Sequence, residues 1–149
     1  FSGGLFLGSS AIDALSAGPF VIDHDQKLGA QGNLTYTSRP GWWSSVSIRY
    51  DSGLVANRSD PDEVAADPDY FDLLPYVNLG SDPPRARPRT IIDLSVGYEY
   101  KRDGKRRWDV QAQAGNITNK TALYNFQSIF VGTRLVQPRT LGVKLRWYF

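Results

Sequence analysis

Six aromatic residues in the segments between the predicted strands have the side chains best suited to contact a ligand. Aromatic ring faces stack on sugars and on metal chelates, and they line many small-molecule sites. The same rings could instead pack one loop against another, and the sequence leaves both interpretations open. The candidate ligand-binding residues are Tyr70, Phe71, Tyr76, Tyr124, Phe126 and Phe130.

Two acidic segments contain the residue types that bind metal ions. In Asp23-His24-Asp25, neighbouring side chains of an extended chain point to opposite sides, so they converge poorly on one ion. A second group supplies the carboxylate oxygens that Ca²⁺ prefers, but it lacks the glycine and glutamate spacing of an EF-hand. We predict solvated segments and no metal site, with calcium in the second segment left open. Its acidic residues are Asp60, Asp62, Glu63, Asp67, Asp69 and Asp72.

The composition excludes several classes of protein. The 149 residues include no Cys and one His, which excludes a disulfide scaffold, a cysteine nucleophile and a His-rich zinc site. Ser52 has no base near it in the sequence and His24 has no positioned nucleophile, so we expect neither an enzyme nor a cofactor. A net charge of +2 without a long basic run argues against nucleic-acid binding. The longest hydrophobic run is three residues, whereas a transmembrane helix needs roughly 18 or more.

Alternation of apolar and polar residues with period 2 is the strongest pattern in the chain. Strand geometry places such alternating residues on opposite faces of a sheet. The 23 positions on the predicted apolar faces carry no charge, whereas the 23 opposite positions include eight charged residues. The predicted strands are 26–37, 42–53, 89–101, 107–117 and 138–149, with a partial sixth at 1–7. The eight charged residues are Lys27, Arg49, Asp51, Asp93, Glu99, Asp109, Lys144 and Arg146.

The connections between the predicted strands are of two kinds. The turns at 39–41 and 102–107 are short and contain Pro-Gly and Asp-Gly. Helical periodicity is almost absent, and its best stretches, 11–15 and 63–66, are too short for core helices. Long loops at one end of a sheet and tight turns at the other are typical of transmembrane β-barrels. The long segments are 9–25, 54–87 and 118–137, and we expect no secondary structure in the second.

A sheet with one apolar and one polar face has two interpretations. In a soluble antiparallel sheet, the apolar face packs on a core. Three features favour a membrane barrel: strands near the roughly 9–11 residues of a transmembrane strand, aromatic residues at strand ends, and a long loop that fits poorly in a small domain. Bacterial barrels have at least about eight strands, so the barrel interpretation requires further strands. The chain starts at Phe1 without a signal-peptide pattern, and we expect it to begin inside a larger protein.

The C-terminal third resembles the end of TonB-dependent outer-membrane receptors. In that family an Asn-rich motif, a loop and a Pro-Arg-Thr element precede an alternating strand that ends on Phe. The corresponding residues here are Asn116-Ile117-Thr118-Asn119, Pro138-Arg139-Thr140 and Phe149. Segments 19–36, 47–57 and 87–100 are also similar to barrel strands of this family.

The resemblance implies a fold, a location and partners. Family members are barrels of about 22 strands that hold a plug and import scarce siderophores, cobalamin or glycans with energy relayed by TonB. We therefore expect an all-β fold, an antiparallel transmembrane β-barrel fragment of five to six long strands, with residues 1–149 as the C-terminal portion of the barrel. The expected location is the outer membrane of a Gram-negative bacterium. The expected partners are outer-membrane lipid, the plug and remaining strands, the TonB complex through that plug, and an unknown small-molecule or glycan ligand.

The resemblance also implies an orientation. Phe149 would lie at the periplasmic end, which makes the short turns periplasmic and the long loops extracellular. The charges on the polar face would then pair with one another or with the plug. Leu145, Trp147 and Phe149 would form the apolar stripe read by the barrel-assembly machinery. Two alternatives stay open: a non-transporting outer-membrane barrel or adhesin, and a soluble β-sandwich binding module.

Overall fold

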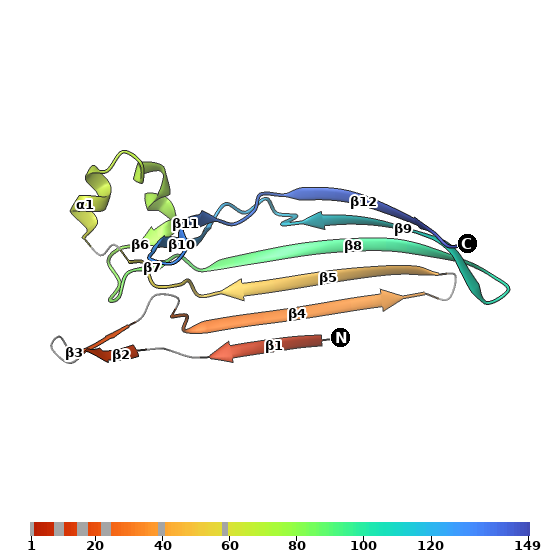
Figure 1. Ribbon diagram of the computed structural model, residues 1–149, viewed down its shortest axis with the longest axis horizontal. Helices are drawn as coiled ribbons and strands as arrows, with labels where there is room; N and C mark the ends of the chain where they lie inside the picture. Colours follow the sequence, from red (N-terminus) through yellow and green to blue (C-terminus); the bar gives the residue numbers. More distant parts are fainter. Residues whose placement is uncertain (1, 8–10, 15–17, 22–24, 39–40, 58–59) are drawn as a thin grey trace.

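A long antiparallel sheet dominates the computed structural model, which describes residues 2–7, 11–14, 18–21, 25–38, 41–57 and 60–149. Its strand order is β1-β4-β5-β8-β9-β12, so β1 and β12 are the outer strands, and the described residues form no closed barrel (Figure 1). The prediction of five to six strands in an antiparallel sheet is confirmed, and the five complete ones lie within two residues of their predicted bounds. The strands are β1 (Ser2–Leu7), β4 (Leu28–Thr37), β5 (Trp42–Asp51), β8 (Arg89–Arg102), β9 (Lys105–Gly115) and β12 (Thr140–Trp147).

Tight turns join the long strands at one end of the sheet. Asp103 and Gly104 form the turn between β8 and β9, and both have positive φ, 55° and 72°. Two consecutive positive φ angles are the feature of a type I′ hairpin turn, and Asp-Gly adopts it readily. Beside the preceding turn, the backbone N–H of Ser38 donates to the carbonyl of Trp42 at 2.8 Å. The C-terminus lies at the same end as these turns (Figure 1).

The pairing register gives the sheet one continuous apolar face. Leu34 lies opposite Val46, which in turn lies opposite Leu94. At the turn end, Trp108 lies between Tyr100 and Trp147. Because side chains alternate along each strand, these rows place the predicted apolar residues of five strands on one side, and the pairing of Leu5 with Ala30 adds β1 to it. We call this side the apolar face and the opposite side the polar face.

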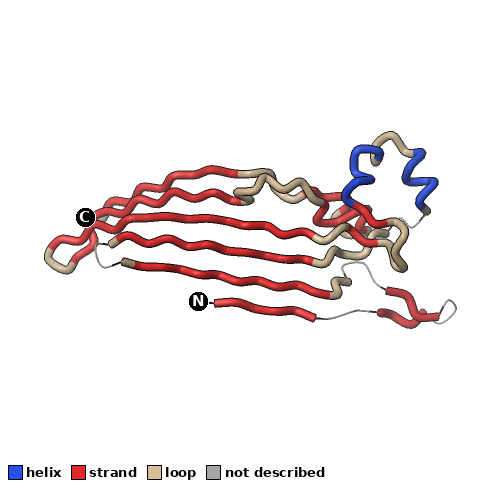
Figure 2. Tube along the Cα trace, turned by 180° about the vertical axis from the view of Figure 1, so that it is seen from behind, coloured by secondary structure: helices blue, strands red, loops and turns tan. Residues whose placement is uncertain are grey.

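The long connecting segments fold at the opposite end of the sheet (Figure 2). The expectation that 54–87 lacks secondary structure is wrong. The candidate helix at 63–66 lies within α1, whereas residues 11–14 form a strand rather than a helix. The elements are β2 (Ala11–Ala14), β3 (Gly18–Val21), α1 (Pro61–Ala66), the 3₁₀ helix η1 (Phe71–Tyr76), β6 (Val77–Asn78), β7 (Arg85–Ala86), β10 (Leu123–Ser128) and β11 (Gly132–Leu135).

The buried apolar core of the described residues lies in these loops and not against the long sheet. Asp60 caps α1, because its Oδ1 accepts hydrogen bonds from the backbone N–H groups of Asp62 (2.9 Å) and Glu63 (3.2 Å). The short helix then buries Val64 completely. The core residues are Ala56, Val64, Val77, Ala86, Leu123 and Phe126. We call residues 54–57, 60–86 and 122–136, which surround this core, the loop cluster.

Candidate functional site

The apolar face is exposed over its whole length. Leu141 and Val143 on β12 are both 78% exposed, and Leu34 on β4 is 57% exposed. Among the described residues, no second layer of helices or strands packs on this face. An apolar surface of this extent on a protein marks a contact with lipid or with another protein. Its other exposed members include Leu5, Leu7, Tyr36, Trp42, Ile48, Leu94, Val96, Tyr100, Leu145 and Trp147.

The polar face carries ion pairs close to the turn end. Arg106 Nη2 lies 2.7 Å from Glu99 Oε1, and Arg146 Nε lies 3.5 Å from Asp109 Oδ1. The Tyr148 hydroxyl also donates to Asp109 Oδ2 at 2.6 Å. The prediction that polar-face charges pair with one another is confirmed for Arg146 with Asp109 and, further along the face, for Arg49 with Asp51, whose Nε and Oδ2 lie 3.8 Å apart. Glu99 pairs instead with Arg106 near the start of β9 and with Lys101 of β8, which lie outside the predicted set.

Arg89 joins the polar face to the loop cluster at the opposite end. Its Nη2 lies 3.1 Å from Asp51 Oδ2 on β5, and its Nη1 donates to the carbonyl of Leu123 at 3.0 Å. Its guanidinium also lies over the Tyr124 ring, 4.7 Å from the centroid. Gln26 Nε2 donates to the other oxygen of Asp51 at 3.0 Å. One buried Arg therefore ties β5, β8 and β10 together. The sequence analysis did not identify it, although Arg89 stands at a polar-face position and directly opposite Asp51 in the register.

A second buried Arg fixes the chain where it enters β4. Arg85 on β7 makes an ion pair of 2.5 Å with Asp25 Oδ2, and its Nη1 donates to the backbone carbonyl of Asp25 at 3.0 Å. Asp25 is almost completely buried. Asp23 and His24, which complete the candidate metal segment, lie outside the described residues. The carboxylate of Asp25, the described member of that segment, therefore binds an Arg side chain.

The Asn-rich motif after β9 forms a junction of hydrogen bonds. Asn116 has a positive φ of 47°, a conformation that Asn tolerates better than most residues. Its Nδ2 donates to the carbonyls of Lys120 (3.0 Å) and Gln137 (2.9 Å), and its Oδ1 accepts from the N–H of Lys120 (2.8 Å). Asn119 Oδ1 accepts from the N–H of Arg139 at 2.9 Å. The motif thus connects the end of β9 to the start of β12, and its role here is to hold the backbone.

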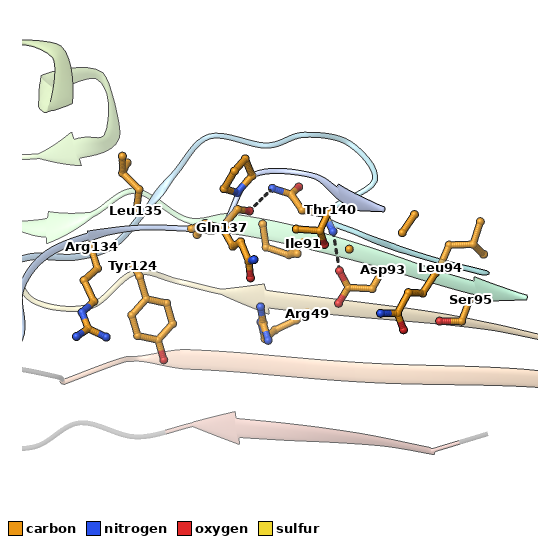
Figure 3. Close-up of a pocket in the computed structure, with 16 residues that line it drawn as sticks. Arg49, Ile91, Asp93, Leu94, Ser95, Tyr124, Arg134, Leu135, Gln137 and Thr140 are labelled. Carbon is orange, nitrogen blue, oxygen red and sulfur yellow. Dashed lines mark hydrogen bonds between the residues drawn. The ribbon is translucent and has the colours of Figure 1, made fainter. Parts of the chain in front are cut away.

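A hollow of about 530 Å³ lies where the polar face meets the β10–β11 hairpin (Figure 3). Arg49 enters it from β5, and Arg134 and Tyr124 enter it from the hairpin. One oxygen of Asp93 already accepts a hydrogen bond from the N–H of Asn116 at 2.7 Å. Two guanidinium groups beside an aromatic ring suit a ligand that carries a carboxylate or phosphate on a hydroxylated body. The other polar lining residues are Ser95, Gln113, Gln137 and Thr140.

The six candidate ligand-binding aromatics separate into two groups. Phe126 is 1% exposed and packs edge to face on Tyr70, with ring centroids 5.5 Å apart. Tyr76 also packs against the core of the loop cluster. These three rings therefore pack within the loop cluster, and Phe126 has no ring face exposed to a ligand. Phe71, Tyr124 and Phe130 are exposed, and of these Tyr124 lines the hollow.

The candidate assembly residues all lie at the turn end of the sheet. Leu145 and Trp147 are exposed on the apolar face, and Phe149, two residues beyond the end of β12, is also exposed. The acidic residues of the loop cluster act locally: Asp60 caps α1, and Asp67 Oδ1 accepts from the N–H of Asp69 at 3.1 Å. Among the described residues, no group of three or more acidic or His side chains is arranged to hold a metal ion.

Two further observations concern the chain as a whole. In the part that the structure describes, no helix is long and apolar enough to cross a membrane. Comparison of the chain with protein-family models, with curated proteins and with solved structures finds no match to any of them.

Proposed function

We propose that this chain forms part of the wall of an outer-membrane β-barrel, with its apolar face toward lipid and its polar face toward the lumen. The observation that carries the proposal is the exposed, uncharged apolar face that the register builds across six strands. A lipid-facing barrel wall is apolar outside and polar inside, and its strands alternate accordingly. The outer strands β1 and β12 would pair with further strands of the same protein, since an open edge in lipid leaves backbone groups without partners.

The arrangement of the two ends supports an orientation for this wall. The folded connections among the described residues lie at one end of the sheet, and the tight turn between β8 and β9 lies at the other (Figure 1). Outer-membrane barrels have short periplasmic turns and longer extracellular loops. We therefore place the loop cluster outside the cell and the Asp103-Gly104 turn in the periplasm.

Within this class, we propose a TonB-dependent receptor that imports a scarce nutrient. The resemblance of the Asn-rich motif, the Pro-Arg-Thr element and the final Phe supports this choice. The hollow lined by Arg49, Arg134 and Tyr124 opens on the lumen side of the wall, beneath the loop cluster. A nutrient carrying carboxylate or phosphate groups would contact these three side chains on its way into the barrel.

Fractionation of cells that produce the full chain tests the proposal. A barrel wall predicts recovery in the outer-membrane fraction, extraction only by detergent, and a gel mobility that changes when the sample is heated. Recovery in the aqueous fraction without detergent would instead support the soluble sandwich. The presence of a plug domain in the full-length protein would distinguish the receptor from a non-transporting barrel, because TonB-dependent import requires a plug.

A further inference from the structure

A hollow of about 420 Å³ lies at the turn end of the apolar face, where the rest of that face carries no charge. Aromatic side chains form most of its walls. Tyr100 and Trp108 stack with centroids 5.6 Å apart and an interplanar angle of 23°. Trp147 lies directly opposite Trp108 in the register, and Phe149 completes the apolar side. Rings of this kind are found at the boundary between the hydrocarbon core and the lipid headgroups.

Two arginines of the β8–β9 hairpin line the same hollow. Arg102 and Arg107 line it together with the rings of Tyr100, Trp108 and Trp147, and Tyr148 lines it as well. A register shift after Tyr100 interrupts the alternation at this point, which allows basic residues to reach the aromatic side. The hollow therefore combines an apolar floor with two guanidinium groups.

Two carboxylates, those of Glu99 and Asp103, lie near the cations of this hairpin. Glu99 binds Arg106 at 2.7 Å and Lys101 at 3.5 Å, and both contacts lie away from the hollow. In the described part of the chain, the ion pair of Arg102 is with Asp103 at 3.9 Å, and both side chains are exposed, so solvent screens this contact strongly. Arg107 forms no ion pair with another residue of the described segments. Among the described residues, Arg102 thus has one exposed carboxylate contact and Arg107 has no ion pair, so both guanidinium groups can bind a further anion.

We propose that this hollow binds the headgroup of an anionic phospholipid. The phosphate would lie on Arg102 and Arg107, and the part of the acyl chain nearest the headgroup would lie on Trp108 and Trp147. Guanidinium groups donate paired hydrogen bonds to phosphate oxygens, and the uncharged apolar face toward the middle of the strands suits an acyl chain. The inference rests on the proposed function, because it requires the apolar face to contact lipid. It adds a specific lipid site at the periplasmic end of β8, β9 and β12.

Quenching of indole fluorescence by brominated lipids tests the site. The full chain is reconstituted into phosphatidylcholine vesicles, in which brominated phosphatidylglycerol or brominated phosphatidylcholine replaces increasing fractions of the lipid. Subtraction of the signal of a Trp108→Phe/Trp147→Phe variant isolates the two indoles of the hollow. The test variant is Arg102→Gln/Arg107→Gln. The matched control, Lys101→Gln/Lys105→Gln, removes two charges from the same hairpin but none that lines the hollow.

The expected result is a preference for brominated phosphatidylglycerol of at least about fivefold, lost in the Arg variant and retained in the Lys control. No preference, or an equal loss in both variants, would overturn the lipid site while leaving the barrel wall intact. Absence of quenching by either lipid would overturn the barrel wall and the lipid site together. Heat-modifiable mobility of each variant shows that it has folded.

Discussion

The side-chain amide of Asn116 donates a hydrogen bond of 2.9 Å to the backbone carbonyl of Gln137, across 21 residues of sequence. The same side chain satisfies both backbone groups of Lys120. Because Asn116 is buried, water cannot replace these bonds when the amide is removed. The contact holds the loop between β9 and β12 at the rim of the sheet.

Asn116→Ala should lower the free energy of unfolding of the full chain by about 1–3 kcal/mol, because buried backbone groups lose their partners. Urea titration of the protein in lipid vesicles measures the change. Asn78→Ala, at an exposed Asn of β6, is the control and should change the value by less than about 0.5 kcal/mol. Equal effects of the two substitutions would show that the Asn116 junction is not what holds the rim.

Arg89→Gln should loosen the loop cluster by leaving the carboxylate of Asp51 without its buried cation. Breaking a buried ion pair in this way costs about 3–5 kcal/mol. Amide hydrogen exchange of the full chain should accelerate near Leu123, whose carbonyl accepts from Arg89. The control is Arg87→Gln, at an exposed Arg whose side chain donates a 3.3 Å hydrogen bond from Nε to the carbonyl of Val77. Unchanged exchange near Leu123 in Arg89→Gln would rule out this role of Arg89.

Gly97→Ala should displace the indole of Trp43, because an added Cβ would lie 2.5 Å from the ring. These residues face each other on β5 and β8, and such overpacking costs about 1–3 kcal/mol. Gly32→Ala is the control, since a Cβ there meets no atom within 4 Å. The expected outcome is a shift in the Trp emission spectrum and a lower unfolding midpoint for Gly97→Ala alone. If neither changes, the indole does not lie over Gly97.

Val143→Lys should destabilise the protein in vesicles by about 2–4 kcal/mol, because it places a charge in the middle of a lipid-facing strand. Gln113→Lys is the matched control, since Gln113 lies on the polar face opposite Gly142 and next to the Val143 row. Gln113→Lys should lower the free energy of unfolding by less than about 1 kcal/mol. A soluble protein whose apolar face meets water would tolerate both substitutions equally.

The long strands could be predicted from the sequence because each alternates over many residues. In β12, for example, Leu141, Val143 and Leu145 alternate with Gly142 and Lys144, and no helical period competes with this pattern. The Asp-Gly pair likewise marked the turn at residues 103 and 104, where two positive φ angles are needed. Local signals of this kind require no knowledge of distant contacts.

The loop cluster and its arginines could not be predicted in the same way. The helix α1 has only six residues, and Val64 is its one buried side chain, so tertiary packing stabilises it rather than periodicity. The partners of Arg89 lie on β5 and β10, and only the register shows that Asp51 stands opposite. For the same reason, sequence alone did not separate the buried ring of Phe126 from the exposed ring of Phe130.

Oxygen and nickel-complex accessibility of spin labels along β12 tests the lipid-facing assignment most directly. The segment contains no Cys, so single Cys residues can be placed at Val143 and Leu145, and at Lys144 and Arg146. In the full chain in lipid vesicles, a lipid-facing wall predicts high oxygen and low nickel accessibility at Val143 and Leu145, with the reverse ratio at Lys144 and Arg146. Low accessibility of Val143 and Leu145 to both reagents would place the apolar face against protein, and high nickel accessibility would place it in water. Either result would contradict the barrel wall.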